Sequence, residues 1–255
     1  MSARIDLNSD LGESFGPWTM GDDDAMLAIV TSANVACGGH AGDPQTMHRT
    51  LRTAANHGVV VGAHPGYADR EGFGRRIIPM SHEEVGLLVA SQVGSLQAIA
   101  ALAGTTVRYV KPHGALGNLA ADDAGVARAI VQAVRAISPS LAVLAISGTV
   151  LEHEARAADQ PVYSEVFADR GYLPNGRLVP RSQPDAMIHD VDQAIDRLLR
   201  WLETGRMAVV GGEPIALAGH SICVHGDSPG AVDMARAIRE RLQARGVAIA
   251  PFLAT

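Results

Sequence analysis

The chain has 255 residues, of which 47% are hydrophobic and 4% aromatic, and its formal net charge is −6. This length can bury a sizeable core, and a negative charge without a basic stripe excludes nucleic acid and anionic membranes as expected partners. No apolar run approaches eighteen residues, and the two cysteines, Cys37 and Cys223, lack CxxC spacing. We therefore expect one domain over residues 1–255 and a cytoplasmic location.

The first expected strand begins at Arg4 and leads into a polar turn that ends at Glu13. Asp6, Asn8 and Asp10 share one parity, so an extended backbone would point all three into one cavity. Buried Asp and Asn side chains are costly unless they are paired or bind a ligand. An EF-hand calcium-binding loop is excluded, because Leu11 occupies the position at which that loop needs glycine. A hydrogen-bonded strand end and a binding site both remain open here.

Six further strands are expected, most of them short apolar runs that end in glycine, proline or histidine. They cover residues 31–36, 59–63, 107–110, 141–146, 162–167 and 221–224. Helical periodicity and capping residues predict helices at residues 22–29, 44–57, 82–103, 126–137, 185–203 and 232–242. A small hairpin is expected from residues 207–210 and 215–218.

Seven strand-then-helix units in order predict parallel strands with right-handed crossovers. Both an open doubly wound sheet and a closed barrel satisfy this order. Five of the seven strands end in polar motifs that are spread over the whole chain, whereas an open sheet would concentrate them at one switch point. The sequence therefore favours an α/β fold in which a seven-stranded parallel β/α (TIM-like) barrel presents all strand ends at one mouth.

Four histidines stand within one residue of a glycine or proline at expected strand ends: His40, His64, His113 and His225. In a closed barrel they would converge with carboxylates, and we expect His113 and His225 to line one cavity. Imidazoles can act as general acids and bases near neutral pH. With carboxylates they can also hold a divalent metal, for which Asp10, His40 and His64 are the candidate ligands, although the sequence has no HExxH motif.

Lys111 is the only lysine in a chain with twenty arginines, so it is less readily explained as an incidental surface charge. It can hold a carboxylate or phosphoryl oxygen as a point charge. It is not a phosphate-loop lysine, because Val110 stands where that loop needs glycine. There is also no GxGxxG after a strand, so any nucleotide would be bound by another device or by a partner protein. Cys37 lies near His40, but a buried structural thiol is the favoured interpretation.

Eight segments, taken together, resemble the LamB/YcsF family, whose members form the A subunit of bacterial 5-oxoprolinase. They occur in the family's order and span nearly the whole chain. The matching segments are Ile5–Glu13, Ala33–Asp43, Gly62–Gly66, Gly72–Arg76, Val110–Leu116, Glu165–Arg170, Leu178–Gln183 and Ile222–Asp227. The sequence departs from the family pattern at Ser9, where cysteine is common, at Gly39 and Gly117, where aromatic residues are common, and at His220, where aspartate is usual.

The resemblance implies a barrel of the glycoside hydrolase and deacetylase type. It implies ATP-dependent opening of the lactam of 5-oxo-L-proline to L-glutamate. It also implies that the B and C subunits of 5-oxoprolinase are needed for activity. The ATP site would then lie on this chain or on a partner. The loss of two aromatic rings is expected to widen the pocket. Two other classes remain open, a metal-dependent deacetylase-like hydrolase and a non-catalytic scaffold that binds a small acid.

Lactam opening needs an anchor for the substrate carboxylate, a base that activates water and donors for oxyanion charge. Lys111 or Arg181 suits the first role, Asp10, His113 or His225 the second, and Asn8 with backbone amides the third. The candidate catalytic residues are Asp6, Asp10, His113, His225 and Asp227. The candidate substrate-binding residues are Asn8, Glu13, His40, His64, Lys111, Glu165 and Arg181.

Overall fold

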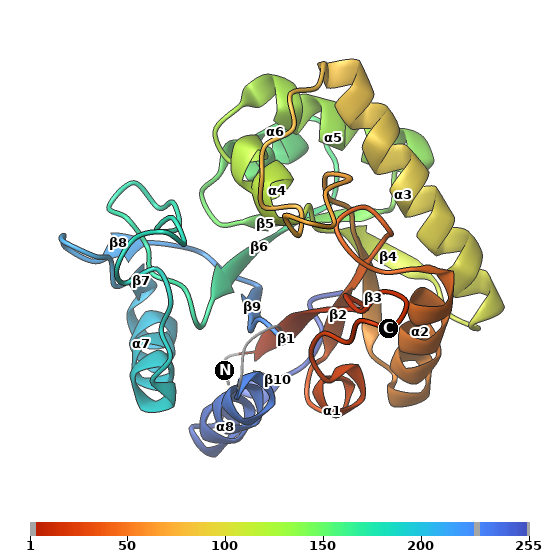
Figure 1. The fold of residues 1–255 in the computed structure, drawn as a ribbon. Coiled ribbons are helices and arrows are strands. Elements are labelled where there is room, and N and C mark those ends of the chain that lie inside the picture. Colours follow the sequence, from red (N-terminus) through yellow and green to blue (C-terminus); the bar gives the residue numbers. More distant parts are fainter. Residues whose placement is uncertain (1–3, 227–229, 254–255) are drawn as a thin grey trace.

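Seven parallel strands follow one another around a barrel in the computed structural model, which describes residues 4–226 and 230–253. Helices lie around these strands (Figure 1). The strands are β1 (Arg4–Leu11), β2 (Ser32–Ala36), β3 (Val60–His64), β4 (Val107–Val110), β5 (Ala142–Ile146), β6 (Val162–Phe167) and β9 (Ser221–Cys223). Because β9 pairs with both β6 and β1, the sheet closes on itself. The prediction of a closed barrel is confirmed.

The described helices include one for every helical region that the sequence predicts. They are α1 (Asp23–Leu27), α2 (Pro44–His57), α3 (His82–Leu102), α4 (Gly114–Ala120), α5 (Ala124–Ile137), α6 (Val150–Ala157), α7 (Val191–Thr204) and α8 (Ala231–Ala244). The expected hairpin is present as β7 (Arg206–Met207) and β8 (Ile215–Ala216), with strands of two residues each. A short strand, β10 (Ala248–Ile249), extends the sheet beside the start of β1.

Local sequence signals explain where two of the long helices begin and end. Asp43 accepts a hydrogen bond from the backbone N–H of Thr46, and α2 ends at Gly58, whose φ of 67° is left-handed. Ser81 and Glu84 form a reciprocal capping box at the start of α3. These caps satisfy backbone groups that a helix end leaves unpaired, so both helices have the bounds that the sequence predicts within one or two residues.

The prediction that the helix expected over residues 185–203 begins at residue 185 is wrong. Asp185 has a φ of 62°, which a right-handed helix does not include, and α7 begins only after Asp190, whose side chain accepts from the N–H of Gln193. The apolar periodicity before that point belongs to a loop. The short helices α4 and α6 were not predicted, and neither has a side-chain cap at its first turn.

α3 is the one described helix that is long and apolar enough to cross a membrane by length and composition alone. In this structure it lies in the outer layer of the barrel, where it contacts α5 and α2. Val85, Val89, Val93 and Leu96 are buried on one face. The apolar character of α3 therefore serves packing against the core.

The barrel interior contains a continuous series of polar side chains along β1. The Ser221 hydroxyl joins Asp6 to the Asn8 amide, which lies 2.6 Å from the Ser221 oxygen. The Asn34 amide donates to Asn8 Oδ1 at 2.7 Å and to Asp10 Oδ1 at 2.8 Å. All three β1 side chains thus face inward, as their shared parity predicts. Each step of two residues brings the next side chain closer to the mouth.

Candidate active site

A cavity of about 390 Å³ opens at the carboxyl ends of the barrel strands. Its lining includes side chains from the ends of β1, β3, β4, β6 and β9. The candidate residues that line it are Asp10, Glu13, His64, Lys111, His113, Glu165, Arg181 and His225. The expectation that His113 and His225 share one cavity is therefore confirmed.

The ammonium group of Lys111 lies between two buried carboxylates. Its Nζ is 3.0 Å from Asp10 Oδ1 and 2.9 Å from Glu165 Oε2, and it also lies 3.2 Å from Cys223 Sγ. Burial on its own would lower the pKa of Lys111, but Asp10, Cys223 and Glu165 outweigh it and hold that pKa well above its usual range. Lys111 is therefore a fixed positive charge inside the barrel.

Glu165 offers a polar atom that the described residues leave unpaired. Its Oε2 accepts from Lys111 and, at 3.3 Å, from the Asn8 amide, whereas the buried Oε1 has no hydrogen-bond partner within residues 4–226 and 230–253. Burial raises the pKa of Glu165, and Lys111 opposes that rise. Glu165 lines the cavity, and a buried acceptor without a partner is a candidate contact for a bound ligand.

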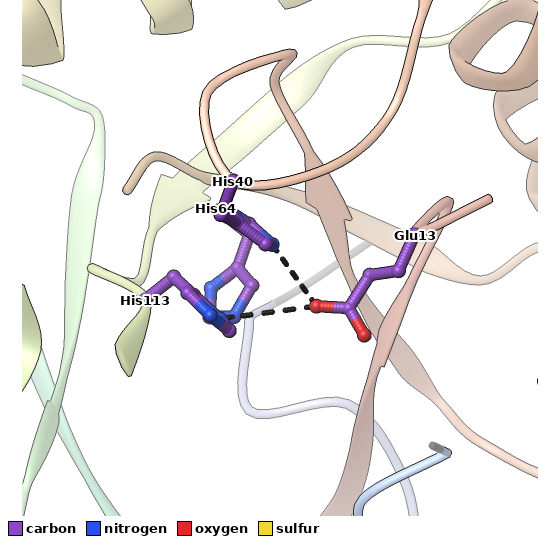
Figure 2. A group of neighbouring side chains, drawn as sticks. All are labelled: Glu13, His40, His64 and His113. Carbon is purple, nitrogen blue, oxygen red and sulfur yellow. Dashed lines mark hydrogen bonds and ion pairs between the residues drawn. The ribbon is translucent and has the colours of Figure 1, made fainter. Parts of the chain in front are cut away.

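Three histidine rings and one carboxylate gather beside this group of charges. Figure 2 shows the Glu13 carboxylate directed at His40 and His113. Glu13 Oε1 lies 3.0 Å from His40 Nε2 and 3.8 Å from His113 Nδ1, and His113 Nδ1 lies 3.0 Å from His64 Nε2. Burial and the neighbouring histidines hold the pKa values of His40 and His113 well below the usual range. This buried Glu/His cluster could hold a metal ion, since four ligand atoms lie within 4.8 Å of one another.

Asp10 connects the Lys111 group to the histidine cluster. Its second oxygen, Oδ2, lies 3.3 Å from His64 Nε2. Burial opposes ionisation of this carboxyl, but its interactions with His64 and Lys111 outweigh burial and hold the pKa of Asp10 well below its usual range. Asp10 is therefore an ionised side chain at the centre of the site.

His225 forms a separate pair with Asp169. Its Nδ1 lies 2.8 Å from Asp169 Oδ2, and its ring stacks on Phe167. Burial would raise the pKa of Asp169, but the charge and hydrogen bond of His225 keep it below the usual range. A carboxylate that accepts from one ring nitrogen orients the imidazole and leaves the other nitrogen as a base. Asp169 was not among the candidates, although it follows a strand end as the others do.

Arginine side chains give the cavity positive charge. Arg75, Arg170 and Arg181 line it. Arg170 is buried, and this burial together with the charge of Arg181 lowers its pKa to about 10. Sequence reasoning selected only Arg181, although Arg170 follows Asp169 directly after the strand predicted at residues 162–167.

Some of the site residues predicted from the sequence do not line the cavity. Asp6 and Asn8 do not line the cavity, and the hydroxyl groups of Thr31, Ser32 and Ser221 donate to Asp6. Burial raises the pKa of Asp6 to about 6, although these hydroxyl groups oppose the rise. His40 belongs to the histidine cluster but not to the cavity lining, and Asp227 lies outside the described residues.

The departures from the family pattern affect the cavity less than expected. Gly39 does not line it, and a Cβ at that position would lie 2.5 Å from the carbonyl oxygen of Gly66. Gly117 does line it, but a Cβ there would lie 2.7 Å from the carbonyl oxygen of Pro112. His220 is exposed and precedes β9, at the opposite end of that strand from His225. Larger side chains at the two glycines would therefore require the backbone to shift.

Comparison with known sequences places the chain among proteins of matching length. The LamB/YcsF family profile matches residues 5–255. The chain is 51% identical over 250 residues to a 5-oxoprolinase A subunit of Agrobacterium fabrum, covering 98% of each protein. It is 49% identical over 253 residues to the 5-oxoprolinase A subunit of Rhodopseudomonas palustris, covering 99% of this chain and 100% of that protein.

Comparison with solved structures shows that the fold of this chain also occurs in other proteins. The crystal structure of the lactam utilization protein from Thermus thermophilus aligns with a TM-score of 0.91 at 43% identity, covering 97% of this chain and 99% of that one. The T48 deacetylase aligns with a TM-score of 0.50 at 11% identity, covering 97% of this chain and 87% of that one. The second similarity concerns the barrel alone.

Proposed function

The chain belongs to the LamB/YcsF family, and we propose from this membership that it is the A subunit of a 5-oxoprolinase. The observation that carries the proposal is the identity of about half of all residues, over the full length, to proteins named as the A subunit of 5-oxoprolinase. That name implies further subunits, and we propose that the B and C subunits are needed for activity. The reaction opens 5-oxo-L-proline to L-glutamate with hydrolysis of ATP, and we place it in the cytoplasm.

A five-membered lactam is a poor electrophile, so water alone opens it slowly. Transfer of the γ-phosphoryl group from ATP to the lactam oxygen releases ADP and activates the ring carbon. One water adds to that carbon and the ring C–N bond breaks, with the nitrogen taking a proton. A second water releases phosphate and leaves glutamate. Because the chain lacks a phosphate loop, we assign the ATP site to a partner protein or to a device of another kind.

The charge distribution of the cavity suits an anionic substrate. We propose that Arg181, with Arg75 and Arg170 nearby, attracts the carboxylate of 5-oxoproline or a phosphoryl group. Lys111 is a weaker candidate for this role than the sequence indicates, because its ammonium is already shared between Asp10 and Glu165. Its proposed role is to keep both carboxylates charged and in place.

Glu165 and the His225–Asp169 pair are the proposed reacting partners. The unpaired Oε1 of Glu165 would accept the lactam N–H, and Asn8 would hold that carboxylate in position. His225, oriented by Asp169, would activate water by accepting its proton. Asn8 is therefore assigned to positioning Glu165 rather than to oxyanion stabilisation.

The direct experiment is reconstitution of the chain with its cognate B and C subunits. We expect 5-oxoproline to stimulate ATP hydrolysis, with glutamate formed in proportion, only when all three are present. A complex in which 5-oxoproline leaves ATP hydrolysis unchanged would refute the proposal. To exclude a scaffold role, Glu165→Gln should assemble into the complex but lose turnover. If the chain instead releases acetate from acetylated sugars without partners, the deacetylase-like alternative is correct.

A further inference from the structure

We propose that Glu13, His40, His64 and His113 bind one divalent transition-metal ion beside the cavity (Figure 2). The inference concerns the chain alone and does not depend on its reaction. It rests on the direction in which the histidine lone pairs point and on the spacing of the ligand atoms.

Two of the rings have one nitrogen already committed to a backbone carbonyl. His64 Nδ1 lies 2.6 Å from the carbonyl oxygen of Lys111, and His113 Nε2 lies 2.8 Å from that of Phe73. A carbonyl oxygen only accepts, so each of these nitrogens carries the hydrogen. In the neutral rings the opposite nitrogens, His64 Nε2 and His113 Nδ1, therefore carry lone pairs. His64 Nε2 also lies 3.3 Å from Asp10 Oδ2, a further acceptor.

Those two lone-pair nitrogens face each other at 3.0 Å. Two acceptors at this distance repel unless a proton or a metal cation lies between them. A shared proton would link only His64 Nε2 and His113 Nδ1. Here Glu13 Oε1 also approaches, 3.8 Å from His113 Nδ1, and His40 Nε2 lies 3.0 Å from that oxygen. The convergence of four ligand atoms favours a metal ion over a shared proton.

The spacing is compatible with one shared ion. With metal–ligand distances of about 2.0–2.2 Å, neighbouring ligand atoms of a tetrahedral site lie about 3.4 Å apart. Three of the six separations between the four ligand atoms are 3.0, 3.0 and 3.8 Å, and all six are within 4.8 Å. Three imidazoles with one carboxylate suit Zn²⁺ or Co²⁺ better than Mg²⁺ or Ca²⁺, which prefer oxygen. Metal-binding histidines commonly donate their other N–H to a backbone carbonyl, as His64 and His113 do here.

The surrounding backbone holds the rings close together. His40 and His113 stack with ring centroids 3.6 Å apart. Gly66 packs against both, because a Cβ there would lie 2.9 Å from His40 Nδ1 and 3.2 Å from His113 Cβ. Since Glu13, His64 and His113 also line the cavity, a bound ion would supply a Lewis acid at its edge.

The test is calorimetric titration of the untagged full-length chain, stripped with a chelator, with ZnCl₂. We expect one Zn²⁺ per chain, and Co²⁺ in its place should give the visible absorption of a tetrahedral site. His64→Ala and His113→Ala should weaken binding at least about 100-fold, and Glu13→Gln at least about 10-fold. His153→Ala, an exposed histidine on α6, is the matched control and should bind as the wild type does.

Circular dichroism establishes that each variant is folded, and Glu13→Gln, which keeps the side-chain size, carries the test if the alanine variants do not fold. Absence of saturable Zn²⁺ binding to the wild-type chain would overturn the proposal, as would equal affinity in the wild type and the cluster variants. Because neither 5-oxoproline nor ATP is present, failure here leaves the proposed reaction untouched.

Discussion

The ammonium nitrogen of Lys111 lies 2.9 Å from Glu165 Oε2 inside the barrel, and both side chains are almost fully buried. This contact makes the single lysine of the chain part of the site's internal charge balance, together with Asp10. It also limits what can replace the lysine, because the pocket that holds Nζ is enclosed by Asn8 and Cys223.

Lys111→Met should remove activity and destabilise the fold, since it leaves two buried carboxylates without a counter-charge. Breaking a buried ion pair in this way costs roughly 3–5 kcal/mol. Lys111→Arg keeps the charge, but the larger planar guanidinium does not fit the same contacts. We expect kcat/KM in the reconstituted complex to fall about ten- to a hundred-fold for the arginine variant. An arginine variant close to wild type would contradict this account.

Asp6→Asn should change how stability depends on pH. The folded-state pKa of Asp6 is raised from 3.8 to about 6, so the folded chain binds more protons than the unfolded chain between these values. In the wild type, this group makes the free energy of unfolding fall as pH rises through that window, by up to about 1.4 kcal/mol per unit. Asparagine does not titrate, so the variant lacks this contribution to the fall in the free energy of unfolding. Its stability relative to wild type, measured by urea unfolding, should therefore increase from pH 4 to pH 7, and a constant difference would refute the assignment.

Asp169→Asn should act on the chemical step through His225. The amide keeps the side-chain size but no longer stabilises the correct ring tautomer and its charge, so we expect kcat to fall about 10²-fold or more with little change in KM. The measurement is steady-state kinetics of 5-oxoproline-dependent ATP hydrolysis across pH. Asp196→Asn, on α7, provides a comparison at a position outside the active-site cavity. An unchanged kcat would remove Asp169 and His225 from the mechanism.

Arg181→Gln should weaken substrate binding more than catalysis. Arg181 is exposed and lines the cavity, so the fold should not depend on it. Loss of one charge-assisted contact to a carboxylate predicts a KM for 5-oxoproline about tenfold higher, with kcat reduced less. If KM is unchanged, the substrate carboxylate is bound elsewhere, and Arg170 becomes the next position to substitute.

The order of the strands explains which parts of the site could be predicted. β2, β3 and β4 are neighbours in the sheet, so His40, His64 and His113 at or after their ends had to meet once the barrel closed. Asp169 meets His225 because β6 pairs with β9. The segment between Asp169 and His225 includes α7 and the hairpin of β7 and β8, so the two residues are far apart in the sequence. Sequence proximity therefore does not indicate this pair.

Parity along β1 correctly placed Asp6, Asn8 and Asp10 on the inner face but not their depth. Two residues of a strand advance by about 6.6 Å, so only Asp10 reaches the cavity. The periodicity before α7 was misleading because local hydrogen bonding at Asp190 decides where that helix begins. That the chain forms one domain stays a prediction.

The central claim is that this cavity opens the lactam, and Asp10→Asn tests it most directly. Asp10 contacts Lys111 and His64, and the amide preserves its size while removing its charge. The measurement is glutamate formed from 5-oxoproline and ATP by the complex with B and C. The account predicts steady glutamate formation with the wild-type chain and almost none with Asp10→Asn, although the variant assembles normally. Near-wild-type glutamate formation by the Asp10→Asn complex would contradict it.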